Sequence, residues 1–330
     1  MEGKLMREDL LQEVESELAL VRMQNEKEEL LRREKIRKEY PDIYELIQQR
    51  EELIFGTLRN ILKGSAEISG LTEKMEQISE SIKAKLEANG FPSDFLAPVY
   101  HCNRCKDTGR TGAPVKEPCE CLKKAYQQKL RTKIGLGSSR KETFESFDSS
   151  IFPDETIPGQ AFSQRDQMKV FRDDCQAWAD SFPYSQYRDI VLTGKSGLGK
   201  TFLLHAMADR LIERDINVLI ISAYRMFEIL RKSYFDQDHG SSDLMDVQVL
   251  MIDDLGSEPL MQNVTVEQLF NLLNERQNKG LSNVVSTNLN LVEFRERYTE
   301  RIASRLTDAR NCMVLSLLGK DIRKEESLKQ

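Results

Sequence analysis

Apolar residues recur with two different spacings along the chain. Between residues 4 and 88 they return every three or four positions, which is typical of amphipathic helices. Beyond residue 189 short runs rich in Val and Ile alternate with helical patterns, and such runs are typical of strands buried on both faces. The pattern therefore predicts a helical N-terminal part followed by an α/β part.

The N-terminal part is expected to form successive helices. Residues 4–39, rich in Glu, Lys and Arg, predict an exposed helix or a short coiled coil. Tyr40-Pro41 breaks the pattern, a second stripe covers residues 43–62, and Asn89-Gly90 ends a third. We expect these stripes to pack within the chain rather than to form a groove for a partner. Their apolar positions are Leu10, Val14, Leu18 and Val21 in the first helix and Leu71, Met75, Ile78, Ile82 and Leu86 in the third.

The C-terminal part alternates strands with helices. Strands are expected near residues 190, 218, 249, 283 and 312, and helices over 165–181, 200–214, 223–234, 265–278 and 291–306. A further helix over 122–134 leads into a polar linker, residues 135–141. Such alternation predicts a parallel sheet covered by helices on both faces, with its ligand at the carboxyl ends of the strands.

A glycine-rich run follows the first of these strands. It has the form G-x-x-x-x-G-K-T, which predicts a P-loop that binds a nucleoside triphosphate and Mg²⁺. The backbone N–H groups would surround the phosphates, Lys200 would reach the outer phosphates, and the Thr201 hydroxyl would bind Mg²⁺. The run comprises Gly194, Lys195, Ser196, Gly197, Leu198, Gly199, Lys200 and Thr201.

Two later strands end in polar residues that complete such a site. The apolar run 249–252 ends in Asp253 and Asp254, a Walker B pattern. Asp253 would hold Mg²⁺, and Asp254 would orient or deprotonate the attacking water. The run 283–287 ends in Asn288 and is expected to form a strand between the P-loop strand and the Walker B strand. From this strand Asn288 is expected to contact the γ-phosphate or the attacking water.

Two arginines lie four residues apart in the last expected helix. Arg301 and Arg305 therefore share a face, which is the layout of an arginine finger that completes a neighbouring subunit's site. The alternative is a surface helix with ordinary salt bridges.

Four cysteines lie close together in the sequence, as Cys102, Cys105, Cys119 and Cys121. Paired thiolates in a reduced compartment predict a structural Cys₄ zinc site, with His101 as a substitute ligand. The alternative is redox disulfides or free thiols. The two remaining cysteines, Cys175 and Cys312, stand in apolar contexts and are expected to be buried.

Aromatic and basic residues alternate in the helix expected at 223–234, before the loop 236–242. Tyr224, Arg225, Phe227, Arg231, Lys232, Tyr234 and Phe235 carry this pattern. It predicts either contacts with single-stranded DNA or an amphipathic helix with its aromatic side chains in the core.

Composition narrows the class of protein. A net charge of −6 and a pI near 5.5 over 330 residues exclude a protein that coats nucleic acid by bulk charge, so DNA contacts must be local. The sequence contains neither a long apolar segment nor a signal region. We therefore expect a cytoplasmic protein without membrane contact.

Together these motifs resemble the DnaC/DnaI/IstB group of AAA+ ATPases over about residues 144–323. The resemblance implies an ATP-dependent loader of a DnaB-type replicative helicase that binds ATP and Mg²⁺ and assembles with copies of itself. The alternatives are an IstB-like transposition helper and a nucleotide-dependent adaptor without hydrolysis. Asp254 is shorter than the Glu that many AAA+ proteins carry there, so we expect slow hydrolysis that DNA or a partner stimulates.

Residues 102–109 also resemble the zinc-bearing N-terminal domain of DnaI-type loaders, which implies that this part contacts the helicase. We therefore expect a helical zinc-binding domain over 1–121, with its zinc module at 101–121, a helix and linker over 122–143, and an AAA+ ATPase domain over 144–330. The short segment after the last strand predicts that a C-terminal lid is missing. Arg323 then either supplies a charge to the nucleotide or lies in a solvated tail.

Overall fold

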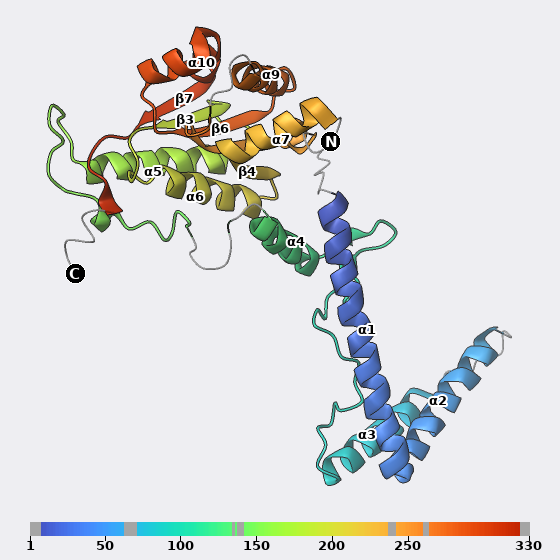
Figure 1. Ribbon diagram of the computed structural model, residues 1–330. Coiled ribbons are helices and arrows are strands. Elements are labelled where there is room, and N and C mark those ends of the chain that lie inside the picture. Colours follow the sequence, from blue (N-terminus) through green and yellow to red (C-terminus); the bar gives the residue numbers. More distant parts are fainter. Residues whose placement is uncertain are drawn as a thin grey trace. The chain divides into compact units, whose positions relative to one another are not determined.

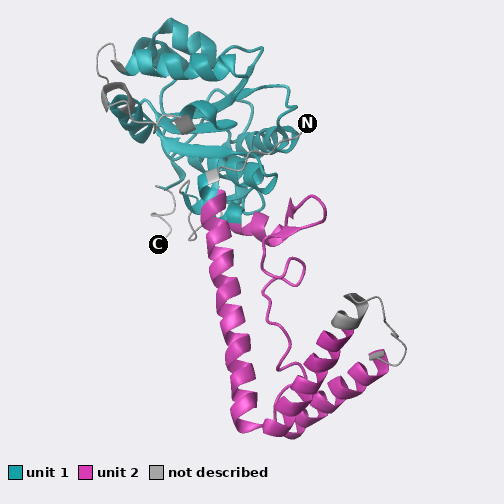
Figure 2. Cartoon of the chain, turned by 90° about the vertical axis from the view of Figure 1, so that its right-hand side faces the viewer, with its two compact units in different colours: residues 1–10, 126–330 teal, residues 11–125 magenta. Residues whose placement is uncertain are grey.

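The computed structural model describes residues 8–62, 71–133, 136, 142–236, 242–259 and 264–323. The chain divides into two compact units, which Figure 2 shows in different colours. Residues 1–10 and 126–330 form the sheet unit, and residues 11–125 form the helical unit. Apart from Leu136, the predicted linker lies outside the described residues, and the predicted domain boundaries stay a prediction.

The sheet unit contains the expected parallel sheet. Its strands follow the order β4-β5-β6-β3-β7, and all adjacent pairs are parallel. Val and Ile are frequent in these strands, and their β-branched side chains pack well in a sheet that is buried on both faces. The strands are β3 (Asp189–Thr193), β4 (Val218–Ser222), β5 (Val249–Leu255), β6 (Ser282–Thr287) and β7 (Cys312–Ser316).

Helices cover both faces of this sheet, as predicted (Figure 1). One face carries α5 (Gln164–Ser181) and α6 (Lys200–Glu213), and the other carries α7 (Ala223–Asp236), α9 (Val264–Asn278) and α10 (Leu291–Leu306). The other described helical elements after residue 119 are α4 (Glu120–Lys133) and the short elements η1 (Ser149–Ile151) and α8 (Ser242–Asp246). Ser163 and Asn290 begin α5 and α10 with capping boxes.

The predicted helix 291–306 is not continuous, which corrects the sequence-based expectation. Thr299 lies inside α10 with φ 73° and ψ 154°, so two helical segments meet there at a kink. A β-branched residue with positive φ is an outlier that surrounding contacts must hold. The neighbouring side chains of Arg297 and Tyr298 both donate to buried Glu258, and these bonds anchor the helix beside the kink.

The helical unit has a much smaller core. It contains α1 (Glu8–Glu39), α2 (Pro41–Leu62), α3 (Leu71–Ala88) and a hairpin of β1 (Arg110–Thr111) and β2 (Glu117–Pro118). The helices meet around Ile36, Ile43, Ile47, Ile82 and Leu86. This cluster confirms internal packing for the second and third stripes, and Leu10 and Val14 of the first stripe are also buried. Among the described helices, none has a stretch long and apolar enough to cross a membrane.

Candidate nucleotide and metal sites

The P-loop connects β3 to α6 at the carboxyl edge of the sheet. Gly199 is the N-cap of α6 with φ 92°, a left-handed conformation that glycine adopts without strain, and it provides no side-chain cap. The first N–H groups of α6 therefore have no capping side chain, and the positive end of the helix dipole faces the loop. This arrangement suits a phosphate group.

Lys200 places its ammonium group inside this loop. Nζ donates to the carbonyl oxygens of Gly194 at 2.6 Å and Lys195 at 2.7 Å, and to Oδ1 of Asn288 at 2.8 Å. Burial lowers the pKa of Lys200, while the charges of Asp254 and Asp253 oppose this shift. The loop thus brings together a buried cation and the side chain expected to contact the γ-phosphate.

Thr201 and Asp253 also lie together, although they come from different elements. Thr201 Oγ1 lies 3.3 Å from Oδ1 and 3.2 Å from Oδ2 of Asp253. A hydroxyl and a carboxylate are the hard oxygen ligands that Mg²⁺ prefers, so this pair fits the ion that a bound triphosphate brings. Sequence reasoning gave no role to Ser286, whose hydroxyl donates to Asp253 Oδ1 at 2.5 Å and accepts from the Asp254 N–H at 2.9 Å.

Asp254 and Asn288 form the next pair along this edge. Asn288 Nδ2 donates to Asp254 Oδ1 at 2.5 Å, and β6 lies between β3 and β5 as predicted. Asp254 itself has φ 61°, which an aspartate tolerates better than most residues. The pair can hold a water molecule against the outer phosphate, because an amide and a carboxylate offer a donor and an acceptor.

These residues line one cavity of about 440 Å³. Its polar lining includes P-loop residues, the two aspartates and Asn288, and its apolar lining comprises Phe147, Ile151, Phe152, Phe202 and Ile322. The Phe147 ring centroid lies 5.8 Å from those of both Phe152 and Phe202. An aromatic wall beside a phosphate loop fits a nucleoside, and only the tertiary fold reveals Phe147 and Phe152 as part of it.

Arg301 and Arg305 are absent from the lining of this cavity. Their guanidinium carbons lie 4.8 and 4.3 Å from the centroid of the Phe270 ring on α9. Arg305 also donates to the Arg301 carbonyl oxygen at 3.3 Å. The two side chains share one helix face as expected, and Arg301 is exposed there.

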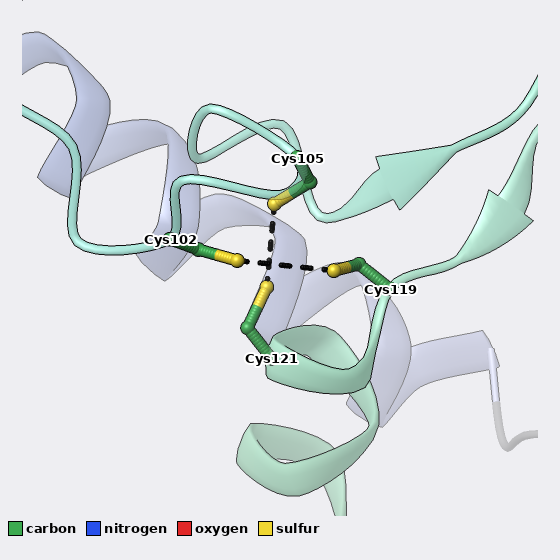
Figure 3. Close-up of side chains that lie close together, drawn as sticks. All are labelled: Cys102, Cys105, Cys119 and Cys121. Atoms are coloured by element: carbon green, nitrogen blue, oxygen red, sulfur yellow. Dashed lines mark hydrogen bonds between the residues drawn. The ribbon is translucent and has the colours of Figure 1, made fainter.

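The four cysteine thiols of the helical unit converge on one point (Figure 3). All four sulfur atoms lie within 4.8 Å of one another, with Cys102 to Cys119 at 3.8 Å and Cys105 to Cys121 at 3.4 Å. A tetrahedral site with Zn–S bonds of about 2.3 Å requires sulfur atoms roughly 3.8 Å apart. The cluster is therefore compatible with Zn²⁺.

The buried carboxylate of Asp107 holds the backbone at Cys102 in place. It accepts from the Cys102 N–H at 2.8 Å, the His101 N–H at 3.1 Å and Asn25 Nδ2 at 2.8 Å. His101 is not part of the thiol cluster, and its Nδ1 lies 3.1 Å from Asn25 Nδ2. A hydrogen bond from the Cys105 N–H is the main reason that the pKa of Cys102 is lowered to about 7.

The two remaining cysteines are buried in the sheet unit, as predicted, with exposed fractions of 0% for Cys175 and 3% for Cys312. Burial also raises the pKa of the Cys312 thiol to about 12.

The helix with alternating aromatic and basic residues, α7, divides its side chains between core and surface. Phe227 belongs to the core, whereas 62% of Tyr224 is exposed. Tyr224 and the exposed Arg231 line one shallow pocket. Arg225 and Lys232 both pair with Glu228. The side chains of Tyr234 and Phe235 and most of the predicted loop lie outside the described residues.

The strand order and the P-loop with its partner carboxylates define an AAA+ P-loop ATPase domain, preceded by a helical region with a Cys₄ cluster. Residues 176–330 match the family described as IstB-like ATP binding protein. The match covers a little under half of the chain, and this part of the chain is similar to that family.

Curated relatives extend this similarity beyond the ATPase domain. The replicative helicase loader DnaI of Bacillus subtilis is 23% identical over 282 residues, which cover 78% of this chain and 84% of DnaI. The replicative helicase loader DnaC of Escherichia coli is 28% identical over 122 residues, covering 35% of this chain and 49% of DnaC.

Solved structures similar to this chain include DnaI and the DnaC helicase loader. The DnaI structure has a TM-score of 0.42 at 21% identity and covers 55% of this chain and 90% of its own. The DnaC structure has a TM-score of 0.43 at 17% identity and covers 53% of this chain and 98% of its own.

Proposed function

We propose that this protein is an ATP-dependent loader of a DnaB-type replicative helicase. The observation that carries the proposal is the similarity to DnaI, which spans 78% of the chain and so includes more than the ATPase domain. A P-loop with its carboxylates and a Cys₄ cluster in the same chain support this function. In this account the sheet unit binds ATP and the helical unit contacts the helicase.

The nucleotide cavity supports a specific division of roles. Lys200 and the P-loop N–H groups bind the phosphates, and Thr201 and Asp253 hold Mg²⁺. Asn288 and Asp254 orient the attacking water, because their side chains already form one bonded pair. We expect slow hydrolysis that single-stranded DNA or the helicase stimulates, since the short Asp254 carboxylate needs help to reach the water.

Self-assembly would bring an arginine to a neighbour's nucleotide. Arg301 is the more accessible of the two candidates, whereas Arg305 is half-buried and also lies within 3.5 Å of Asn274. Because an arginine finger acts in trans, the position of both residues outside their own chain's cavity supports this role. ATP would then set the assembly state, and hydrolysis would release it.

Single-stranded DNA would contact the exposed face of α7. Tyr224 offers a ring for base stacking, and Arg231 offers a charge beside it. Replacement of both Arg231 and Lys232 by Ala should weaken DNA binding and reduce its dependence on salt concentration. Unchanged binding in a salt titration would assign these residues to an ordinary protein surface.

The loader function is tested by mixing the full-length protein with the replicative helicase of the same organism, with and without ATP, and measuring the mass of the complex. We expect a stable complex with wild type that disappears when Cys102 and Cys119 are both replaced by Ser. The Lys200→Ala variant should still bind the helicase but should not respond to ATP. The absence of any complex in either condition would reject the loader function.

The family description favours one second candidate, an IstB-like helper ATPase of transposition, because the match covers residues 176–330 alone. Such a protein would not need the helical unit to engage a helicase, so the mass measurement separates the two functions. The other alternative, an adaptor that binds ATP without hydrolysis, predicts no turnover in wild type even with DNA and partner present.

A further inference from the structure

The segment that follows β7 lies against the P-loop. We call residues 317–323 the strap. The Leu317 N–H donates to the Thr193 carbonyl oxygen at 2.7 Å, and the Ile322 N–H donates to the Gly197 carbonyl oxygen at 3.1 Å. Both ends of the strap are therefore bonded to β3 or to the loop that follows it.

Two buried glutamines of α5 fasten the strap on its other side. Gln167 accepts from the Leu318 N–H at 2.8 Å and donates to the Ser316 carbonyl oxygen at 3.2 Å. Gln164 accepts from the Lys320 N–H at 2.9 Å and donates to the Lys320 carbonyl oxygen at 3.0 Å. Because each amide satisfies both a donor and an acceptor of the backbone, the path of the strap is well determined.

Gly197 fits this path closely. The P-loop pattern requires glycine at 194 and 199 but allows any residue at 197. A Cβ atom at Gly197 would lie 1.7 Å from Oδ1 of Asp321, so any larger residue would displace the Asp321 side chain, and its φ of 77° also favours glycine. The same Asp321 oxygen accepts from the Arg323 N–H at 3.0 Å, which fixes the backbone of Arg323.

Arg323 therefore emerges at the nucleotide cavity, where it lines the wall together with Ile322, Lys200 and Thr201. The pKa of Lys200 is lowered mainly by burial. The nearby positive charge of Arg323 lowers it further, to a smaller extent. Two cations facing one cavity repel each other, and an anion with several charges relieves this repulsion.

We propose that Arg323 binds the phosphate chain of the nucleotide in its own subunit, and that Gln164, Gln167 and Asp321 position it there. This inference rests on the proposed ATP-dependent function and adds a ligand to the nucleotide site. The guanidinium forms charge-assisted hydrogen bonds to phosphate oxygens, while apolar side chains of the lining contact the base. No bond is made or broken in this step.

The test measures the affinity of the full-length protein for a fluorescent ATP analogue, with Mg²⁺, by equilibrium titration. The Arg323→Ala variant should bind about ten- to a hundredfold more weakly, which is the loss expected for a charge-assisted hydrogen bond. Arg323→Lys should recover part of the affinity. Adenosine, which has no phosphate, should compete equally well in wild type and variant.

Arg310→Ala is the matched control. Arg310 is exposed, it pairs with Asp308 just before β7, and it does not line the cavity, so ATP affinity should not change. If Arg323→Ala and Arg323→Gln, shown by circular dichroism to be folded, bind ATP as tightly as this control, the proposal is wrong. If wild type itself does not bind ATP, the ATP-dependent function fails as well, so the two failures are distinguishable.

A double-mutant cycle tests the positioning role of Gln164. Gln164→Ala should weaken ATP binding when Arg323 is present and should have little further effect in the Arg323→Ala background. Additive losses would show that Gln164 stabilises the fold without placing Arg323.

Discussion

The two units of this protein are stabilised in different ways. In the sheet unit, a continuous core between the sheet and α7, α9 and α10 includes fully buried Leu250, Leu269, Leu272 and Val285. In the helical unit the core around Ile43 and Leu86 is small. The segment around the thiols relies instead on four cysteines and on the buried carboxylate of Asp107. Hydrophobic burial suffices for the sheet unit, whereas we expect the thiol segment of the helical unit to need a metal.

Zinc removal should give the largest difference between the units. Structural zinc contributes about 10–16 kcal/mol of apparent binding free energy in small modules, so Cys119→Ser should leave the thiol segment without order. We expect one zinc per chain in wild type by elemental analysis, and fast hydrogen exchange over residues 102–121 in the variant. ATP affinity should stay unchanged.

The matched control for this experiment is Cys175→Ala, which removes a buried thiol of the sheet unit and should leave the zinc content at one per chain. Wild-type protein without zinc, purified in the absence of chelator, would remove the basis of the comparison.

Core truncations should affect one unit at a time. Leu272 and Leu86 are 0% and 1% exposed in the cores of the sheet unit and the helical unit. Replacement of either by Ala should cost about 2–5 kcal/mol through lost transfer energy and the cavity left behind. Hydrogen exchange should locate each loss in its own unit. Leu20→Ala, at a position that is 58% exposed, serves as the control with little effect, and equal losses in both units would contradict the comparison.

The sequence predicts the features that rest on local patterns and misses those that rest on contacts between distant segments. The strands, the P-loop and the cysteine cluster follow from local patterns, because β-branched runs, glycine spacing and paired thiols each have a physical signature. The kink at Thr299, the bond of Ser286 to Asp253 and the glutamine pair on α5 do not, since they depend on contacts between distant segments. Buried Arg276 is a further example, because its partners Leu244, Val247 and Ser282 are backbone carbonyls that meet only in the fold.

A smaller effect is expected from the support of the zinc site. Asp107→Asn would place an amide N–H₂ among the donors that now point at the carboxylate. Loss of such a supporting partner typically costs about 10- to 100-fold in metal affinity. Competition with a zinc chelator would measure this change. Glu120→Gln is the control, since the Glu120 carboxylate pairs with Lys123 at the surface. Equal affinities in both variants would show that Asp107 does not support the site.

The smallest effect concerns a surface pair of the sheet unit. The pKa of Asp308 is lowered to about 2, mainly by the hydrogen bond that it accepts from the Arg310 side chain. The folded-state pKa lies below the unfolded value, so the pair stabilises the protein at neutral pH, and this contribution is lost as the pH falls from about 4 towards 2. Denaturant unfolding of wild type and Asp308→Asn should therefore converge at low pH. A constant difference over this range would contradict the assignment.

The central claim is that the sheet unit supplies the ATP response and the helical unit supplies the helicase contact of one loader. The most direct measurement is the transfer of the cognate helicase onto circular single-stranded DNA by wild type, Lys200→Ala and Cys119→Ser, together with the mass of each helicase complex. We predict ATP-dependent transfer by wild type, a complex without transfer for Lys200→Ala, and neither complex nor transfer for Cys119→Ser. A Cys119→Ser variant that binds and transfers the helicase like wild type would contradict the account.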